Sequence, residues 1–360
     1  MKRLFIMAVA ATAMLTACEK TDIIPAGDAQ EISFVAVNQT STKVPVDNTT
    51  FLNGDNMAVA AYIVKGAEEK GNFFNYTLFS KTADNTWSGN PARYWPLTTS
   101  TINFLAVTET GGGVDKTDVK FNSTNYAYGA QVVLKDNCVY NQNDLMFAAG
   151  QGTHTQGSVY DKVNMTFKHA LAWINFTVKT ATPAAGATTG CTITVNSITL
   201  NNANFNGTLN LVNTNFDKEE NVTTGGITAT WNLTGMTKES IKVPNSSGNA
   251  FANAVTLNNE EQLFGNGLLV VPDGYAESFT INYTLTQGDG TANNYNYTYY
   301  LPTPTSGTTA WEMAKKYFYN INITLTEVLV KPGVAKWEDQ SSNTPLDGIG
   351  QEEQENNPNN

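Results

Sequence analysis

Residues 163–178 read Val-Asn-Met-Thr-Phe-Lys-His-Ala-Leu-Ala-Trp-Ile-Asn-Phe-Thr-Val, and this run decides the fold. Its first part places apolar side chains at every second position from Val163, an alternation typical of a strand with one buried face. From Ile174 onward the apolar side chains occupy the other set of positions. A change of phase inside one extended run predicts either a β-bulge or a strand that exchanges one set of partners for another.

Short stretches of this kind recur along the chain and are separated by turn residues. The clearest hairpin joins 279–285 to 295–301 around Gly288-Asp289-Gly290, while residues 311–316 are predicted to form one helical turn. No segment of helix length separates the strands, so the sequence predicts an all-β protein made of antiparallel β-sandwiches. The other predicted strands are 31–37, 57–64, 74–79, 101–108, 192–200, 207–211, 268–272, 317–325 and a short one at 334–337.

Two polar segments suggest where the domains end. Residues 180–190 are small and flexible, which is typical of a linker. We therefore expect an N-terminal sandwich over 31–180 and a C-terminal sandwich over 190–337. Residues 338–360 are acidic and polar with almost no apolar side chain, and this composition predicts disorder.

The N-terminus resembles a bacterial lipoprotein signal peptide. A basic start and a short apolar run lead into Leu15-Thr16-Ala17-Cys18, which is similar to a lipobox. Residues 1–17 would be removed, Cys18 would carry acyl chains, and 18–30 would form a tether at the outer membrane. Each buried CH₂ contributes about 0.8 kcal/mol, so several chains would anchor the protein stably. The alternative is an ordinary secretory signal with a chance cysteine.

Composition argues against several kinds of site. The 21 Lys and Arg residues face 32 Asp and Glu residues, and the formal net charge of −11 opposes binding to nucleic acid. The sequence has two histidines, of which His169 is predicted to be half-buried on a strand and His154 to be solvated in a loop. No metal or other cofactor is expected. Cys138 and Cys191 are predicted to be separate buried thiols, with a disulfide as the alternative.

No pattern points to catalysis. The sequence lacks a nucleophile elbow, a P-loop and a dinucleotide fingerprint, and the acidic pairs at 219–220 and 260–261 are expected to be solvated. We therefore predict that the protein is not an enzyme, although two distant carboxylates can form a hydrolase site. Exposed aromatic residues could stack on glycans, but core packing is the favoured interpretation for Trp87, Tyr94, Trp95, Trp231 and the cluster 295–300.

Several segments together resemble the fimbrillin family of Bacteroidetes, the Mfa-like or type V pilin subunits. No single segment is specific, but their order from 18 to 337 covers nearly the whole mature chain. The resemblance implies two tandem transthyretin-like β-sandwich domains, in agreement with the strand pattern. The segments are Cys18, Ile32-Ser-Phe34, Thr42-Lys43, the motif from Phe51 to Val59, Tyr94-Trp95-Pro96, 102–106, 144–148, 167–171, 311–323 and Val334-Ala-Lys-Trp337.

The same resemblance implies a mode of assembly. A trypsin-like protease would remove the first strand, 31–37, with its alternate residues Ile32, Phe34 and Ala36, and a donor strand of another fimbrial subunit would fill the groove. Lys43 is the candidate cleavage site, and the alternative is an ordinary solvated lysine. Arginine occurs only at Arg3 and Arg93, so a site that demands arginine is missing from this loop.

The C-terminus departs from the pattern of stalk subunits, which carry an apolar donor strand there. After Trp337 the chain offers only Leu346 and Ile349, and the candidate donor 325–337 is expected to belong to the second sandwich. This favours a tip, accessory or anchor subunit at the cell surface, with a host or glycan ligand that the sequence does not identify. The competing hypothesis is a monomeric surface lipoprotein that binds glycans.

Overall fold

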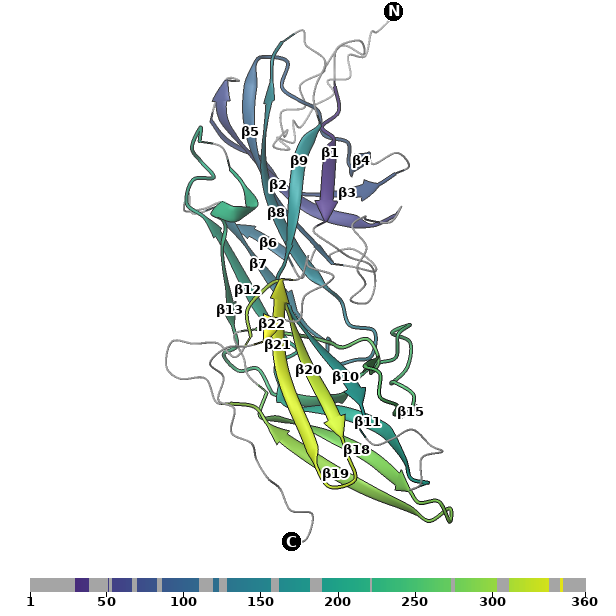
Figure 1. The fold of residues 1–360 in the computed structure, drawn as a ribbon. Coiled ribbons are helices and arrows are strands. Elements are labelled where there is room, and N and C mark those ends of the chain that lie inside the picture. The colour runs from purple at the N-terminus through teal and green to yellow at the C-terminus, as the bar shows by residue number, and fades with distance from the viewer. Residues whose placement is uncertain are drawn as a thin grey trace, which may run out of the picture.

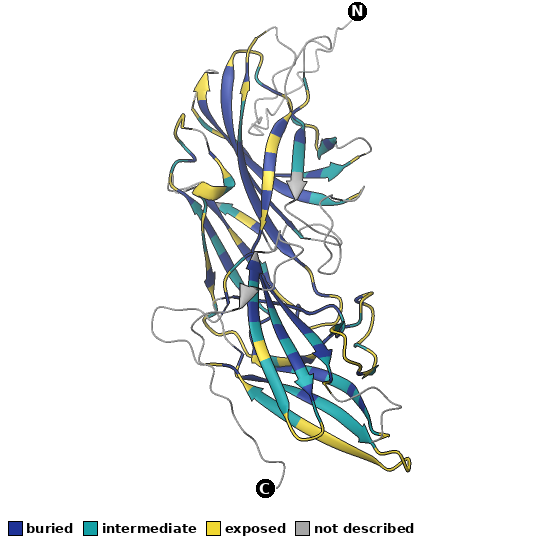
Figure 2. Ribbon diagram, viewed as in Figure 1, coloured by how far each residue is buried: buried dark blue, intermediate teal, exposed yellow. Residues whose placement is uncertain are grey.

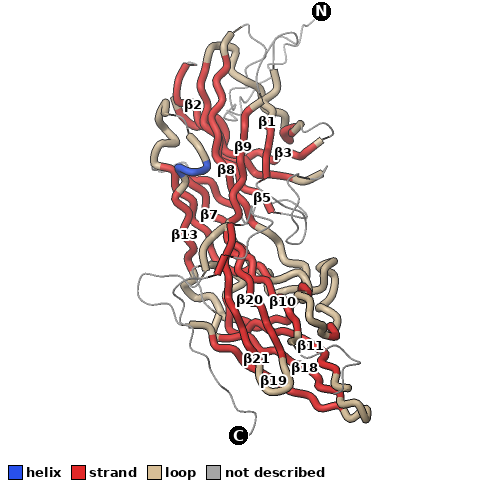
Figure 3. Tube along the Cα trace, viewed as in Figure 1, coloured by secondary structure: helices blue, strands red, loops and turns tan. Residues whose placement is uncertain are grey.

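The computed structural model describes residues 30–38, 51, 54–66, 70–82, 86–109, 119–122, 128–156, 162–181, 190–220, 222–272, 276–302, 311–336 and 344–345. Most of these residues lie in strands, and the described helical structure is a single 3-10 turn, Thr224–Gly226 (Figure 3). The predicted all-β class is therefore confirmed. The molecule is elongated, with one pair of sheets at each end (Figure 1).

The first pair of sheets packs around a core that includes Val107, Val132, Phe147, Leu209 and Leu211. The larger sheet has seven strands in the order β1-β9-β8-β5-β2-β3-β4 and the smaller has four in the order β13-β12-β7-β6. The strands of the larger sheet are β1 (Phe34–Asn38), β2 (Asn56–Gly66), β3 (Gly71–Lys81), β4 (Trp87–Asn90), β5 (Ser100–Glu109), β8 (Leu145–His154) and β9 (Val163–His169). Those of the smaller are β6 (Val119–Asn122), β7 (Tyr128–Leu134), β12 (Gly207–Asn213) and β13 (Thr228–Asn232).

The second pair packs around Phe176, Phe264, Phe279, Ile281 and Tyr319. One sheet has the order β16-β10-β20-β21-β22 with β17 also on β10, and the other has the order β14-β11-β18-β19 with β15 also on β11. The first comprises β10 (Ala172–Lys179), β16 (Gln262–Leu263), β17 (Leu268–Val270), β20 (Lys315–Ile323), β21 (Val328–Lys336) and β22 (Thr344–Pro345). The second comprises β11 (Thr192–Ala203), β14 (Glu239–Lys242), β15 (Val255–Thr256), β18 (Ser278–Thr286) and β19 (Ala292–Tyr300).

The sheets do not divide the chain at the expected linker. The four-stranded sheet takes β6 and β7 from before residues 180–190, but it takes β12 and β13 from after them. The segment 180–190 instead joins β10 to β11, which both belong to the second pair of sheets. The chain passes between the two sandwiches at three places: from β9 to β10, from β11 to β12 and from β13 to β14.

The change of phase in 163–178 marks the first of these passages. β9 lies in the seven-stranded sheet and ends at His169, whereas β10 begins at Ala172 and lies in the other sandwich. The predicted change of strand partners is thus confirmed. The two residues between them are held from both sides, because the Ala170 carbonyl accepts from the Trp231 indole at 2.9 Å and the Leu171 carbonyl accepts from the Ala314 N–H at 3.0 Å.

Other details differ from the sequence-based expectations. β1 pairs with β9, and β10 with β20, in parallel, so the sheets are mixed and not purely antiparallel. No helical turn forms in 311–316, because Ala314 has a left-handed φ of 55° and β20 starts at the next residue. The hairpin of β18 and β19 is present as predicted. Within 338–360 the structure describes only Thr344–Pro345, which pair with β21.

A buried glutamine also connects the two sandwiches. Gln142 lies in the connection from β7 to β8, and its side-chain amide replaces a strand partner for Leu269 of β17. The amide donates to the Leu269 carbonyl at 2.7 Å and accepts from the Leu269 N–H at 2.8 Å, and both residues are buried. Since the two backbone groups are satisfied by one side chain, their hydrogen bonding depends on Gln142.

We expect Gln142→Leu to lower the free energy of unfolding by at least about 2 kcal/mol, because it leaves a buried N–H and a buried C=O without these partners. Urea denaturation followed by tryptophan fluorescence measures the change. The matched control is Gln131→Leu on β7, where an exposed amide makes one 3.3 Å bond to Asn210, and its effect should stay within about 0.5 kcal/mol. Equal losses of stability for the two substitutions would contradict the conclusion that the Leu269 backbone depends on Gln142.

Candidate functional site

The first strand occupies the edge of the seven-stranded sheet. β1 lies parallel to β9, with Phe34 opposite Val163 and Ala36 opposite Met165. Successive side chains of a strand point to opposite faces. Ile32 and Phe34 are fully buried on the inner face, and Ala36 is half-buried against the same core. The structure thus brings together the three residues that the sequence analysis singled out in this strand.

Phe34 fills a pocket lined by aromatic rings from the sheet. Its ring meets Phe79 of β3 edge-to-face at 4.8 Å between centroids, and Phe104 of β5 at 5.2 Å. Edge-to-face pairs add about 0.5–1.5 kcal/mol to the gain from burial. The pocket belongs to a second core on the face of the seven-stranded sheet that is turned away from the four-stranded sheet. The sheet is therefore buried on both faces, and the strands β2 and β5 are dark blue along most of their length in Figure 2.

The segment just before β1 pairs with the chain that follows β4. The Ile32 N–H donates to the Arg93 carbonyl at 2.7 Å, and the Trp95 N–H donates to the Gln30 carbonyl at 3.0 Å. Glu31 and Tyr94 form an antiparallel bridge between these bonds. Because β1 and β4 are the two ends of the sheet, this pairing closes the curled sheet on itself.

Two residues opposite the first strand are adapted to this closure. Trp95 is buried, and Gly152 of β8 leaves room for it, since a Cβ on Gly152 would lie 2.6 Å from the Trp95 ring. Arg93 stacks on Phe74 at 5.1 Å from the ring centroid and donates from Nε to Thr77 at 2.8 Å. These contacts of Arg93 and Trp95 hold in place the segment that pairs with residues 30–32.

Removal of residues 30–38 would open a strand-shaped groove. The floor would expose Phe79, Phe104 and Met165, which are all fully buried in the intact chain. The Arg93 carbonyl and the Trp95 and Val163 N–H groups would lose the partners they have in 30–33. Such an edge accepts an extended strand, whose backbone supplies hydrogen bonds and whose alternate side chains enter the apolar pockets. In the intact chain, residues 30–38 occupy this site themselves.

Cys18 and Lys43, the other two residues singled out from the sequence, lie outside the described residues. The structure therefore does not place them against the groove. Lys43 follows the end of β1 by five positions in the sequence.

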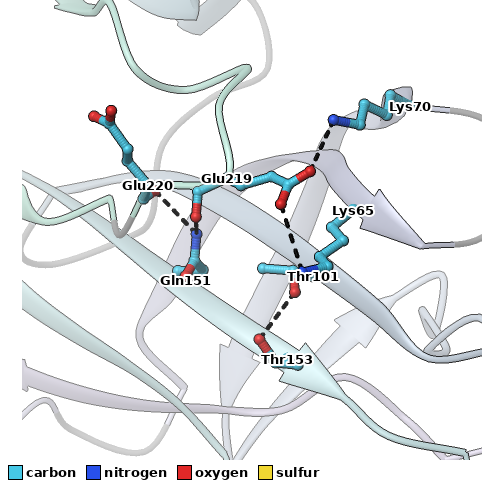
Figure 4. Close-up of polar contacts among 7 residues, drawn as sticks. All are labelled: Lys65, Lys70, Thr101, Gln151, Thr153, Glu219 and Glu220. Carbon is cyan, nitrogen blue, oxygen red and sulfur yellow. Dashed lines mark hydrogen bonds and ion pairs between the residues drawn. The ribbon is translucent and has the colours of Figure 1, made fainter.

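Apart from the first strand, a polar cluster holds the connection from β12 to β13 against the seven-stranded sheet (Figure 4). Glu219 forms ion pairs with Lys70 at 3.0 Å and Lys65 at 3.6 Å, and the hydrogen bond from Lys70 is the main reason that its pKa is lowered. The Gln151 amide donates to the Glu220 carbonyl at 3.0 Å. The carboxyl groups of Glu219 and Glu220 point apart, so they do not form a catalytic pair.

The anchor of this clamp is a residue that the sequence analysis missed. Asn103 of β5 is fully buried and donates to the carbonyls of Phe216 at 2.9 Å and Lys218 at 3.0 Å. The signal in the sequence is a polar residue in the middle of the apolar strand 101–108. We interpret the cluster as a structural clamp, because buried amides on backbone carbonyls order a loop.

The histidines do not form a metal site. His169 is fully buried, and its Nδ1 lies 2.7 Å from an Asp144 oxygen. The prediction that His154 is solvated is wrong: it is the last residue of β8, packs 6.3 Å from the Trp95 ring and is 2% exposed. Burial lowers the pKa of His154. Within the described ranges no group of three or more His, Cys, Asp or Glu residues could hold a metal ion.

The cysteines and aromatic residues mostly serve packing. Cys138 and Cys191 are separate half-buried thiols, and burial together with Glu239 raises the pKa of Cys138 to about 12. Trp87, Trp95 and Trp231 are buried, which confirms the core-packing interpretation for them. Tyr94, Tyr295 and Tyr300 are exposed, so the core-packing interpretation is wrong for these three. In the described part of the chain, no helix is long and apolar enough to cross a membrane.

The family comparison covers most of the chain. A family model described as fimbrillin-like matches residues 42–337. The chain matches none of the curated protein sequences.

The chain is similar to solved structures at low sequence identity. A fimbrial protein from Bacteroides vulgatus is 14% identical with a TM-score of 0.52, and the match covers 86% of this chain and 100% of that one. A fimbrial assembly protein from Parabacteroides distasonis is 11% identical with a TM-score of 0.42, and the match covers 87% of this chain and 97% of that one. The likeness to the Bacteroides vulgatus protein supports the fold.

We expect Phe34→Ala to lower the free energy of unfolding by about 3–5 kcal/mol, because it empties a pocket that the surrounding sheet cannot collapse into. Thermal or urea denaturation of the purified protein measures this loss. Val35→Ala is the matched control on the opposite face of the same strand, and it should cost about 1 kcal/mol or less. A loss for Phe34→Ala no larger than that for Val35→Ala would show that β1 does not hold the second core together.

Proposed function

Because the chain belongs to the fimbrillin-like family, we propose that it is a fimbrial subunit of the bacterial surface, that it has no catalytic role, and that it assembles by exchange of its first strand. The observation that carries the proposal is the position of β1. With the segment just before it, β1 inserts the fully buried side chains of Ile32 and Phe34 into the core on this face of the seven-stranded sheet, and backbone bonds hold the two to β9 and to residues 93–95. A strand in this position can be replaced by another strand with the same alternation.

The proposed sequence of events begins with cleavage after Lys43. Until then, β1 is covalently tied to the groove that it fills, and no strand of another subunit can compete with it. Cleavage turns β1 into a separate short peptide whose hold depends on its pairing alone. A donor strand of another subunit then binds in the groove, and the head-to-tail geometry of this contact extends into a filament.

The position of β21 supports a tip, accessory or anchor role in preference to a stalk role. β21 is the last long strand in the described part of the chain, and it pairs with β20 over its whole length, Val328 to Lys336. Val328, Val330 and Val334 pack against the core of the second pair of sheets. A strand already used in this way is not a spare donor, so we propose that this subunit accepts a strand and does not provide one through its C-terminus.

The proposed attachment to the outer membrane runs through Cys18. Acyl chains on this residue would hold the subunit at the membrane, and the polar residues up to 30 would act as a tether. The partners are then other fimbrial subunits on one side and the lipid bilayer on the other.

Cleavage after Lys43 is expected to convert the monomer into a form that accepts a donor strand. Limited trypsin digestion followed by intact mass measurement should show an early product that begins at residue 44. The cleaved protein should then bind a synthetic peptide of residues 30–43, which restores β1, and lose binding when Phe34 in the peptide is replaced by Asp, because a charge in the apolar pocket is strongly unfavourable. Fluorescence anisotropy of the labelled peptide measures the binding.

Lys43→Gln should prevent this product and the binding of the peptide. Lys116→Gln is the matched control, because this lysine also lies in a polar segment between strands but its cleavage releases no part of β1. A chain that is not cut near residue 43, or that is cut there without gaining affinity for the peptide, would refute strand exchange at this site. Oligomers that survive denaturing gel electrophoresis after cleavage would show that the subunit also donates a strand and would refute the tip or accessory role.

Cys18→Ser is expected to move the protein from the membrane fraction to the soluble fraction of the cell, because it removes the thiol that carries the acyl chains. Cell fractionation with immunoblotting measures the distribution. Thr16→Ser, two residues before the cysteine, keeps the thiol; it is the control and should leave the protein in the membrane fraction. An unchanged distribution of Cys18→Ser would contradict lipid attachment at this residue.

A further inference from the structure

The strand β19 forms the end of its sheet and is exposed along most of its length. It pairs with β18 on one side, and no strand in the described part of the chain pairs with its other side. Tyr295 is 36% exposed and Tyr300 is 60% exposed. In Figure 2 the first part of the strand appears yellow at the end of the molecule that lies away from β1.

The hydrogen-bond pattern shows which backbone groups of β19 point outward. Beyond its two ends, Thr291 accepts from Gln287 at 2.8 Å and Leu301 donates to Glu277 at 3.0 Å, in the same register as the strands themselves. In an antiparallel ladder, bonded and non-bonded positions alternate. The odd-numbered residues therefore bond to β18, and the outward N–H and C=O groups belong to Ala292, Asn294, Asn296, Thr298 and Tyr300.

Proteins usually protect such an edge with charges, prolines, bulges or short strands. The other end of the same sheet follows that rule, because the four-residue β14 carries Glu239 and Lys242. β19 is nine residues long, reads Ala-Asn-Asn-Tyr-Asn-Tyr-Thr-Tyr-Tyr, and keeps one register with β18 throughout. It contains no charged residue and no proline, so nothing within the strand opposes pairing.

In the hairpin of β18 and β19, side chains of the same residue type contact each other across the two strands. Thr280 lies 3.1 Å from Thr298, and Asn282 donates to Asn296 at 2.8 Å. Thr284 donates to Asn294 at 2.6 Å, which is a mixed pair of the same two residue types. A second copy of β19 would thus meet partners of the type that β18 provides.

We propose that β19 pairs antiparallel with β19 of a second copy of this chain, about a two-fold axis at Asn296. This register overlaps the two strands over their full length, since Asn296 is the central residue of Ala292–Tyr300. It places Asn294 opposite Thr298 of the second copy and Ala292 opposite Tyr300. All of these are the outward-bonding positions, so the backbone ladder is complete in this register.

Charge explains why this strand is suited to the contact. The chain has a formal net charge of −11, and two copies repel each other over most surfaces. The uncharged β19 lets the sheets join without placing like charges opposite each other across the new strand pair. The contact is isologous, so it closes at two copies and joins them side by side.

Sedimentation velocity of the chain spanning residues 19–360, which holds every described residue, tests the proposal over a series of protein concentrations. We expect a reversible monomer–dimer equilibrium. Asn296→Lys places two like charges at the two-fold axis and should raise the dimer dissociation constant about tenfold or more. Thr230→Lys is the matched control on β13, another exposed edge strand, and it should leave the equilibrium unchanged.

A cross-link fixes the register independently. In Asn296→Cys the two thiols face each other across the axis, about 5 Å apart at Cβ, so a short thiol cross-linker should give a covalent dimer that Thr230→Cys does not give. A monomer at every concentration, a dimer that Asn296→Lys leaves intact, or equal cross-linking of the two cysteine variants would overturn the proposal. The uncleaved chain is used throughout, so the result does not depend on strand exchange at β1, which needs cleavage.

Discussion

The passage of the chain through Ala170 and Leu171 is the constraint on which both sandwiches depend. One extended run must bury side chains in two different cores, and it can do so only by changing its strand partners between His169 and Ala172. The backbone at this point keeps its hydrogen bonds because each sandwich supplies a donor: the Trp231 indole from the four-stranded sheet and the N–H of Ala314, the residue just before β20. The buried pair of His169 and Asp144 stands directly before the turn.

The seven-stranded sheet has a different requirement, because both of its faces are apolar. One face is covered by the four-stranded sheet, and the other curls around Phe79 and Phe104 and needs the first strand to complete it. The burial of Ile32 and Phe34 stabilises the folded chain, and in the proposed strand exchange it would make the empty groove select another alternating strand. Stability of the single chain and affinity for a partner would then come from one set of contacts.

The sequence predicted those features that depend on local alternation. Strands such as β2, β5 and β11, the change of phase at Ile174 and the β18–β19 hairpin follow from side-chain periodicity, and so does the burial of Ile32 and Phe34. The strands β7, β8 and β13 were not predicted. The division into sheets did not follow, because nothing local in 207–232 shows that β12 and β13 return to the first sandwich. His154, Asn103 and Gln142 were missed for a related reason: their partners at Trp95, Phe216 and Leu269 lie far away in the sequence.

The three passages between the sandwiches have a mechanical consequence. In a chain of domains joined by single linkers, a pulling force acts on one covalent connection at each joint. Here the two halves are joined by the segments after β9, β11 and β13, so a tension along the long axis is divided among three backbones. Neither half can be pulled away as a separate folded unit, since the chain passes between the two halves three times. A force along the long axis therefore acts on both halves together.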